Sequence, residues 1–169
     1  MDLDEATLGA DDQEFKLDER DAVRDVALAM VSQCKRTLDI VSRHLDPPLF
    51  DTAEFAEAVR ALALASRYSR IRIVVCDPQP LIKRGHRLVE LANRLPTFIS
   101  LRKPGLTHRQ FNEAWLLADS TGYLRRRLAD LYETTGSFNA RREVRNLMQQ
   151  FDELWEQGEP DPNLRRLHL

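Results

Sequence analysis

The chain lacks the features that mark disulfide-rich, metal-binding or membrane-spanning proteins. It has two cysteines in 169 residues, Cys34 and Cys76, and neither has a CxxC partner or a histidine at metal-ligand spacing. No run approaches the roughly 18 apolar residues needed to cross a bilayer, and the N-terminus has no signal-peptide pattern. We therefore expect buried, reduced cysteines in a cytoplasmic protein that needs no metal, cofactor or membrane.

Aromatic residues are also scarce, at 7% of the chain, whereas its hydrophobic share of 43% and charged share of 31% are typical of a globular protein. The length suits one domain, with a core large enough to fold without disulfide or metal staples. Few aromatic side chains are left over to stack nucleic-acid bases. Those near the middle of the chain are expected in the core: Phe98, Phe111, Trp115 and Tyr123.

The net charge of −2 conceals a segregation of charge along the chain. Residues 1–21 contain nine acidic and two basic side chains, and residues 83–109 contain seven basic and one acidic. The acidic start, residues 1–18, is expected to be a disordered tail. Segregated charge bears on partners rather than on fold. The tail could cover the basic segment or serve only as a solubilising extension.

Hydrophobic periodicity predicts an α/β fold with a mixed sheet flanked by helices. Helices are expected at residues 21–34, from 51 or 52 onwards, at 81–95 and at 140–156. Strands are expected at 37–41, 70–76, 97–101, 111–118 and 122–127. The first three strands alternate with helices, which predicts parallel pairing through crossovers, and the last two form a C-terminal hairpin. The domain is expected to span 19–157, followed by an extended tail, 158–169, whose Leu167 and Leu169 could dock on the core.

A group of spaced residues in the second half resembles one half of a phospholipase D-like domain. That family carries HxKxxxxD on a central strand, then Gly-Ser-x-Asn, then a helix ending in Phe-x-x-Leu-Trp. The matching residues are Asp119, Gly136, Ser137, Asn139, Phe151, Leu154 and Trp155. Counting back from the aspartate places Asn112 at the histidine position and Ala114 at the lysine position. The alternative register, from His108, is also incomplete.

The resemblance implies a phosphodiesterase, but the residues at the two key positions do not support that chemistry. An asparagine amide has no nucleophilic lone pair comparable to that of imidazole and cannot shuttle a proton near neutral pH. Alanine removes a donor aimed at developing negative charge. We therefore expect a non-catalytic domain in which Asn112, Ala114, Asp119, Ser137 and Asn139 are vestigial. Active relatives combine two motifs in one pocket, so a homodimer is a further expectation.

The whole chain is similar to an uncharacterised bacterial family with degenerate phospholipase D-like architecture. The similarity rests on the helix segment Gly85–Leu88 and on the ending Asp161–Leu167. Some members of that family are joined to a GNAT-type N-acetyltransferase, which implies at most a shared cellular context. The loop that would bind acetyl-CoA is absent from this sequence.

The basic segment supplies the candidate anion-binding residues. They are Arg84, His86, Arg87, Lys103, His108 and Arg109. Ligand crevices of doubly wound sheets lie at the carboxyl ends of strands, which is where these residues are expected. The alternative is a solvated basic helix face on which His86 caps locally.

Two other groups have competing interpretations. Residues 136–139 could bind a ligand oxygen, or could form a loop and N-cap for the last helix. Asp46, Asp77 and Asp119 all follow predicted strands, but no spacing supports a metal site.

Three functions remain open from the sequence. The first is a non-catalytic domain that binds a nucleic acid or another phosphate-bearing partner. The second is a protein-interaction or dimerisation module. The third is a divergent phosphodiesterase that uses His108 or His86.

Overall fold

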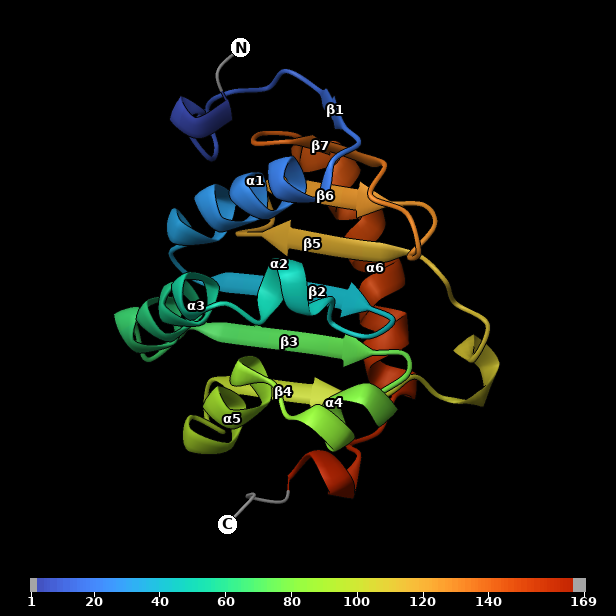
Figure 1. Ribbon diagram of the computed structural model, residues 1–169. Helices are drawn as coiled ribbons and strands as arrows, with labels where there is room; N and C mark the ends of the chain where they lie inside the picture. Colours follow the sequence, from blue (N-terminus) through green and yellow to red (C-terminus); the bar gives the residue numbers. More distant parts are fainter. Residues whose placement is uncertain (1–2, 166–169) are drawn as a thin grey trace.

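The computed structural model describes residues 3–165, which form a mixed seven-stranded sheet flanked by helices (Figure 1). The strand order is β1-β7-β6-β5-β2-β3-β4. The strands are β1 (Phe15–Leu17), β2 (Thr37–Ser42), β3 (Arg70–Val75), β4 (Ile99–Arg102), β5 (Ala114–Ala118), β6 (Gly122–Arg126) and β7 (Thr134–Ser137). β2, β3 and β4 pair in parallel, and every other pairing is antiparallel. The predicted fold class is confirmed.

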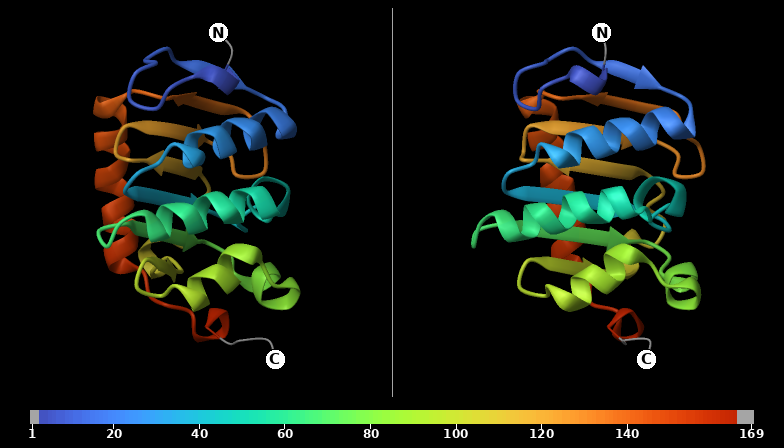
Figure 2. Two further views of the ribbon diagram at one scale, coloured as in Figure 1. Left: turned by 90° about the vertical axis from the view of Figure 1, so that its left-hand side faces the viewer. Right: turned by 60° about the vertical axis from the view of Figure 1, so that its left-hand side comes forward.

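The helices are distributed unequally over the two faces of the sheet (Figure 2). They are α1 (Arg20–Ser32), α2 (Pro47–Phe50), α3 (Ala53–Ala65), α4 (Gln79–Arg84), α5 (Arg87–Arg94) and α6 (Arg141–Gln157), with 3-10 turns η1 (Leu3–Glu5), η2 (Leu106–His108) and η3 (Pro162–Leu164). α1, α3 and α5 lie side by side on one face, and α6 alone runs across the strands on the other. The larger core lies under the first group, and a smaller one lies under α6.

Local sequence explains the elements that were predicted. β2 and β3 are buried on both faces, as expected of parallel strands covered by helices on both sides. Thr52 caps α3 by accepting a hydrogen bond from the Phe55 N–H at 3.1 Å. Three residues, 119–121, connect β5 to β6, and the turn is made by Asp119 and Ser120, whose φ angles are 53° and 56° and across which the Thr121 N–H donates to the Ala118 carbonyl at 2.9 Å.

The N-terminal segment is not the disordered tail that its acidity predicted. β1 adds an edge strand to β7, with Lys16 opposite Thr135, and Ala6 is buried against the larger core. Gly9 N–H donates to the Phe138 carbonyl at 2.8 Å. The apolar side chains scattered among the acids, such as Phe15, supply the contacts that order this segment.

Three further boundaries differ from the expectation. The helix expected at 81–95 is two helices, because Gly85 adopts a φ of 76° and His86 starts a new helix as its N-cap. Gly136 and Ser137, which were expected in a loop, belong to strand β7. The last segment folds back, with Lys103 and Glu159 exchanging two backbone hydrogen bonds and Leu164 buried. The expected docking of Leu167 and Leu169 falls outside the described residues.

Neither cysteine is paired, and Cys34 is buried as expected while Cys76 is half-buried. Within residues 3–165, no helix has the length and apolar character that a membrane span requires.

Candidate anion-binding site

The candidate site lies where the carboxyl ends of β2, β3 and β4 meet the amino end of β5. β5 is antiparallel to β2, with Trp115 opposite Val41, so the residues that precede β5 reach the same edge of the sheet. We call this the carboxyl edge. It comprises residues 43–46, 76–80, 103–113 and 126–131.

Ala114, at the lysine position of the motif, is not accessible to a ligand at this edge. Ala114 is 6% exposed and pairs across the hairpin with Arg126, which is 5% exposed. The Arg126 guanidinium donates to the Leu131 carbonyl at 2.8 Å, to the Ala129 carbonyl and to the Asp46 carboxylate. The cation next to the missing lysine is therefore already bound by the protein. Asn112 contributes a backbone bond here, because its carbonyl accepts from the Ala129 N–H at 2.9 Å.

The rest of the motif lies at the opposite edge of the sheet. The Asp119 carboxylate accepts backbone N–H groups of Lys35, Arg36 and Thr37 at 2.8–3.0 Å. Ser137 is buried in β7 opposite Tyr123, which in turn faces Leu117 near the far end of β5.

Ser137 and Asn139 therefore do not share a pocket with Asn112 and Ala114. The Ser137 hydroxyl accepts the Asn139 N–H at 3.2 Å. The N-cap of α6 is Ala140, without a side-chain cap, so the expected capping role of residues 136–139 is wrong.

Three cations lie around Cys76 at the carboxyl edge. Lys103 and Arg109 line a small cavity of about 180 Å³ together with the thiol. Arg43 follows β2 directly and acts on the same thiol electrostatically. Burial raises the pKa of Cys76 to about 11, against a lowering by Arg43, so this thiol is protonated at neutral pH and is a poor nucleophile. Lys103 is also 3.7 Å from the Glu159 carboxylate.

Two histidines lie near these cations but face carboxylates. His44 Nδ1 is 3.3 Å from the Asp77 carbonyl and 3.6 Å from its carboxylate. His108 Nε2 is 3.9 Å from Glu153 on α6, and its Nδ1 is buried without a hydrogen-bond partner among residues 3–165. His108 is thus turned toward α6.

The other candidates of the basic segment have separate positions. Arg84 is exposed at the end of α4. Arg87 donates to the Asp51 carboxylate and carbonyl at 3.2 and 2.9 Å. His86 is 3% exposed: Nε2 bonds the Leu45 carbonyl at 2.9 Å and Nδ1 accepts the Leu88 N–H at 3.1 Å. The geometry of His86 matches the local capping alternative and leaves neither ring nitrogen for a ligand.

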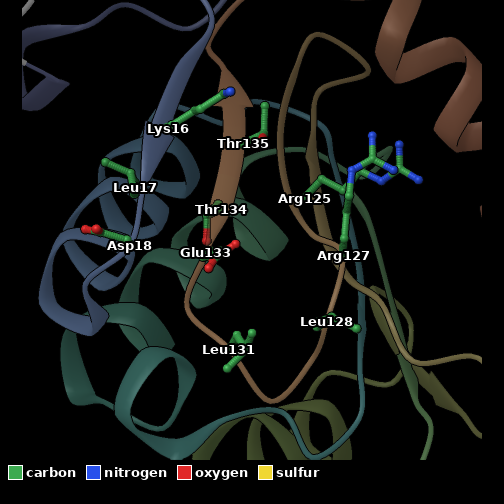
Figure 3. A pocket seen from close by; sticks show the side chains of 10 residues that line it. All are labelled: Lys16, Leu17, Asp18, Arg125, Arg127, Leu128, Leu131, Glu133, Thr134 and Thr135. Atoms are coloured by element: carbon green, nitrogen blue, oxygen red, sulfur yellow. The ribbon is translucent and has the colours of Figure 1, made fainter.

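A larger cavity of about 650 Å³ opens farther along the sheet, between β1, the end of β6 and the start of β7 (Figure 3). In Figure 3 the side chains of Arg125, on β6, and Arg127, directly after it, project in the same direction, while Lys16 belongs to β1. Asp18 and Glu133 also line it. Arg125 is already paired with Glu113 at 2.7 Å. This mixed lining favours no single class of charged ligand.

No metal centre is indicated. Asp46 binds Arg126, and Asp119 lies at the opposite edge from Asp77. Among residues 3–165 there is no cluster of three His, Cys, Asp or Glu side chains that could hold an ion.

Sequence reasoning missed four residues of the carboxyl edge: Arg43, His44, Cys76 and Arg126. The first two lie within three residues of the end of the strand predicted at 37–41, so the strand-end rule could have selected them. Arg126 had no local signal, because its partner Asp46 is 80 residues away.

Residues 19–167 match a family model described as a domain of unknown function, DUF7931. The chain belongs to the DUF7931 family. No curated protein sequence matches it.

Solved structures with similar folds include two phospholipase D-type proteins and one chromatin protein. NucT from Helicobacter pylori has a TM-score of 0.64 at 11% identity, with coverage of 88% of the DUF7931 chain and 99% of NucT. Nuc from Salmonella typhimurium, a phospholipase D family member, has a TM-score of 0.56 at 12% identity, with coverage of 87% and 97%. The DUF7931 chain therefore has the phospholipase D-like fold.

The third neighbour is TrmBL2, an archaeal chromatin protein whose structure shows a mode of DNA binding. Its TM-score is 0.63 at 13% identity, over 89% of the DUF7931 chain. The match spans 54% of TrmBL2, about half of its length. At these identities the likeness concerns the fold.

Proposed function

We propose that this DUF7931 protein is a non-catalytic phospholipase D-like domain that binds a phosphate-bearing partner, a nucleic-acid backbone, at its carboxyl edge. The proposal rests on one observation: this edge has cations but lacks the histidine and the lysine of the motif. Arg43, Lys103 and Arg109 lie near Cys76, with the Glu159 carboxylate beside Lys103 on the same cavity, whereas Asn112 and Ala114 occupy the positions of the nucleophile and its cation. Cations without a nucleophile can hold a phosphodiester but cannot cleave it through a covalent intermediate.

The state of the remaining groups supports binding over catalysis. Arg126 is neutralised by Asp46, and burial keeps Cys76 protonated. His108 is only 20% exposed at its side chain and is turned toward Glu153. A nucleophile needs a base within hydrogen-bond reach and access to the reacting atom. A DNA-binding protein among the neighbours of similar fold favours nucleic acid as the partner.

The experiment measures fluorescence anisotropy of labelled single- and double-stranded oligonucleotides over a salt series. We expect binding at low salt that weakens steeply as salt rises, because bound phosphates release counterions. Arg109→Ala should reduce the magnitude of the salt slope by about 0.7 for single strands and about 0.9 for duplexes, the value of one phosphate contact.

The matched control is Arg60→Ala, which removes another exposed arginine, one that is ion-paired to Glu57 on α3. It should leave the slope unchanged. Equal slopes for Arg109→Ala and wild type would contradict the site. Turnover of a generic phosphodiester that His108→Ala or His44→Ala abolishes would contradict the non-catalytic assignment.

The homodimer and the acetyltransferase context implied by the sequence resemblance remain proposals. Light scattering over a range of protein concentrations tests the first: a mass that stays at that of one chain, 19.6 kDa, would exclude a dimer.

A further inference from the structure

A second charged surface lies at the opposite edge of the sheet, where the parallel strands begin. β2 and β3 start side by side, with Thr37 opposite Arg70, so the loops that precede them touch. Arg70 N–H donates to the Arg36 carbonyl across these loops at 2.9 Å. We define the amino-edge patch as the exposed side chains of these loops and of the first residue of β3; they are Lys35, Arg36, Arg67, Tyr68 and Arg70.

Tyr68 is the aromatic centre of the patch. It is 59% exposed, so it contributes little to the core. The guanidinium carbon of Arg67 lies 4.7 Å from the ring centroid, and that of Arg36 lies 5.7 Å from it. Ser66 Oγ accepts the Tyr68 N–H at 3.0 Å, which fixes the backbone beneath the ring. Both guanidinium groups therefore lie within cation–π distance of one exposed ring.

The acidic groups near the patch are already engaged. Asp119 accepts three backbone N–H groups of the first loop. Asp39 is fully buried and bonded to Arg72 at 2.7 Å, and Arg70 approaches it only to 3.9 Å. No ion pair joins Lys35, Arg36 or Arg67 to a carboxylate among the described residues, so the patch presents net positive charge to solvent.

Charge together with an exposed aromatic ring selects the class of ligand. Phosphates bind arginine and lysine side chains, and unpaired bases stack on aromatic rings and on guanidinium planes. A duplex offers its phosphates but keeps its bases stacked and paired. We propose that the amino-edge patch is a binding site for single-stranded nucleic acid, with a base stacked at Tyr68 and phosphates at the surrounding cations.

This site is separate from the carboxyl edge and does not depend on it. Tyr68 and Arg67 lie at the amino ends of β2 and β3, whereas Arg43 and Arg109 belong to the carboxyl edge. Variants at the two edges therefore test two surfaces independently.

The test uses anisotropy of a short fluorescein-labelled oligothymidylate, an abasic strand of the same length and a duplex. Tyr68→Ala should weaken oligothymidylate binding about 5- to 150-fold, the range that corresponds to loss of one stacked base. The same substitution should leave the affinity for the abasic strand unchanged. Tyr68→Phe should bind as wild type, because the ring is kept and only the hydroxyl that accepts from Arg67 is lost.

The charge contribution is tested separately. Arg67→Ala should reduce the magnitude of the single-strand salt slope by about 0.7, while Arg24→Ala, an exposed arginine on α1 paired with Asp21 and Asp25, should not. Circular dichroism and the unfolding midpoint should match wild type, since all these side chains are exposed.

Three results would overturn the proposal. They are equal affinity of Tyr68→Ala and wild type for oligothymidylate, an equal loss of affinity for the abasic strand, and binding of the duplex alone. If Arg109→Ala has no effect but Tyr68→Ala weakens binding, the function proposed for the carboxyl edge fails and the amino-edge site stands.

Discussion

At the amino edge of the sheet, Asp119 accepts three backbone hydrogen bonds, whereas at the carboxyl edge Asn112 and Ala114 occupy the positions that the resemblance assigns to a histidine and a lysine. Asp119, the part of the motif that is present, has a structural role, because it binds the loop before β2 to the β5–β6 hairpin. The part that differs would serve chemistry alone. In the function proposed above, this division is what lets the chain adopt the phospholipase D-like fold while it binds a phosphodiester without cleaving it.

The same two edges also differ in what they do with arginine. Arg126 at the carboxyl edge is 5% exposed and bound by three acceptors, while Arg36 and Arg67 at the amino edge are exposed beside an aromatic ring. A buried guanidinium with satisfied donors stabilises the protein locally, and an exposed one can still bind a ligand. Sequence counts of basic residues cannot separate these cases.

Ala114→Lys should have the largest effect. It places the lysine of the motif at a buried position that lies opposite a second cation, Arg126. The new ammonium would be buried opposite Arg126, so we expect a loss of about 3–5 kcal/mol in the free energy of unfolding. Urea denaturation measures the loss. Ala114→Met controls for volume and should cost about 1–3 kcal/mol.

An Ala114→Lys variant as stable as Ala114→Met would show that the carboxyl edge has room for a second cation. Phosphodiester turnover by Asn112→His/Ala114→Lys would go further, since it would show an intact catalytic pocket that lacks only two side chains.

Asp119→Ala tests the amino edge and should cost about 2 kcal/mol of unfolding free energy. The loss has two sources: hydrogen bonds to a charged acceptor, and a left-handed backbone conformation that alanine tolerates poorly. Asp119→Asn should cost less, because its amide oxygen still accepts and asparagine tolerates this conformation. Urea denaturation distinguishes them, with Asp130→Ala, an exposed acid of the β6–β7 loop, as the control. If Asp119→Ala is no less stable than that control, Asp119 does not have the structural role described here.

Local sequence was sufficient where the signal was local. Strand β3, the start of α3 and the β5–β6 hairpin each depend on neighbours in the chain, and each was predicted. β1 and β7 were missed because they are three and four residues long and Lys16 pairs with Thr135, more than a hundred residues away. The carboxyl edge was predicted as a location, but its closure by Arg126 depends on a distant partner that no pattern reveals.

His86 provides the smallest and most specific test, because it was a ligand candidate in the sequence and is a buried cap in the structure. Burial lowers its pKa, against the opposing effects of the Asp51 charge and the bond to the Leu45 carbonyl; Arg87 lowers it further and Glu90 raises it. The cap also requires neutral imidazole, since Nδ1 accepts the Leu88 N–H. Below the ordinary histidine pKa of about 6.5, the unfolded chain therefore binds a proton that the folded protein does not.

The free energy of unfolding should consequently fall as the pH drops below about 6.5, by at most about 1.4 kcal/mol per pH unit from this group. His86→Asn can still accept the Leu88 N–H but has no titratable ring, so its unfolding free energy should depend less on pH than that of wild type. Urea denaturation of both proteins between about pH 5 and pH 8 measures the difference, and the other histidines cancel in the comparison. Parallel curves for the two proteins would mean that His86 accepts a proton in the folded state, which would return it to the set of groups available for binding an anion.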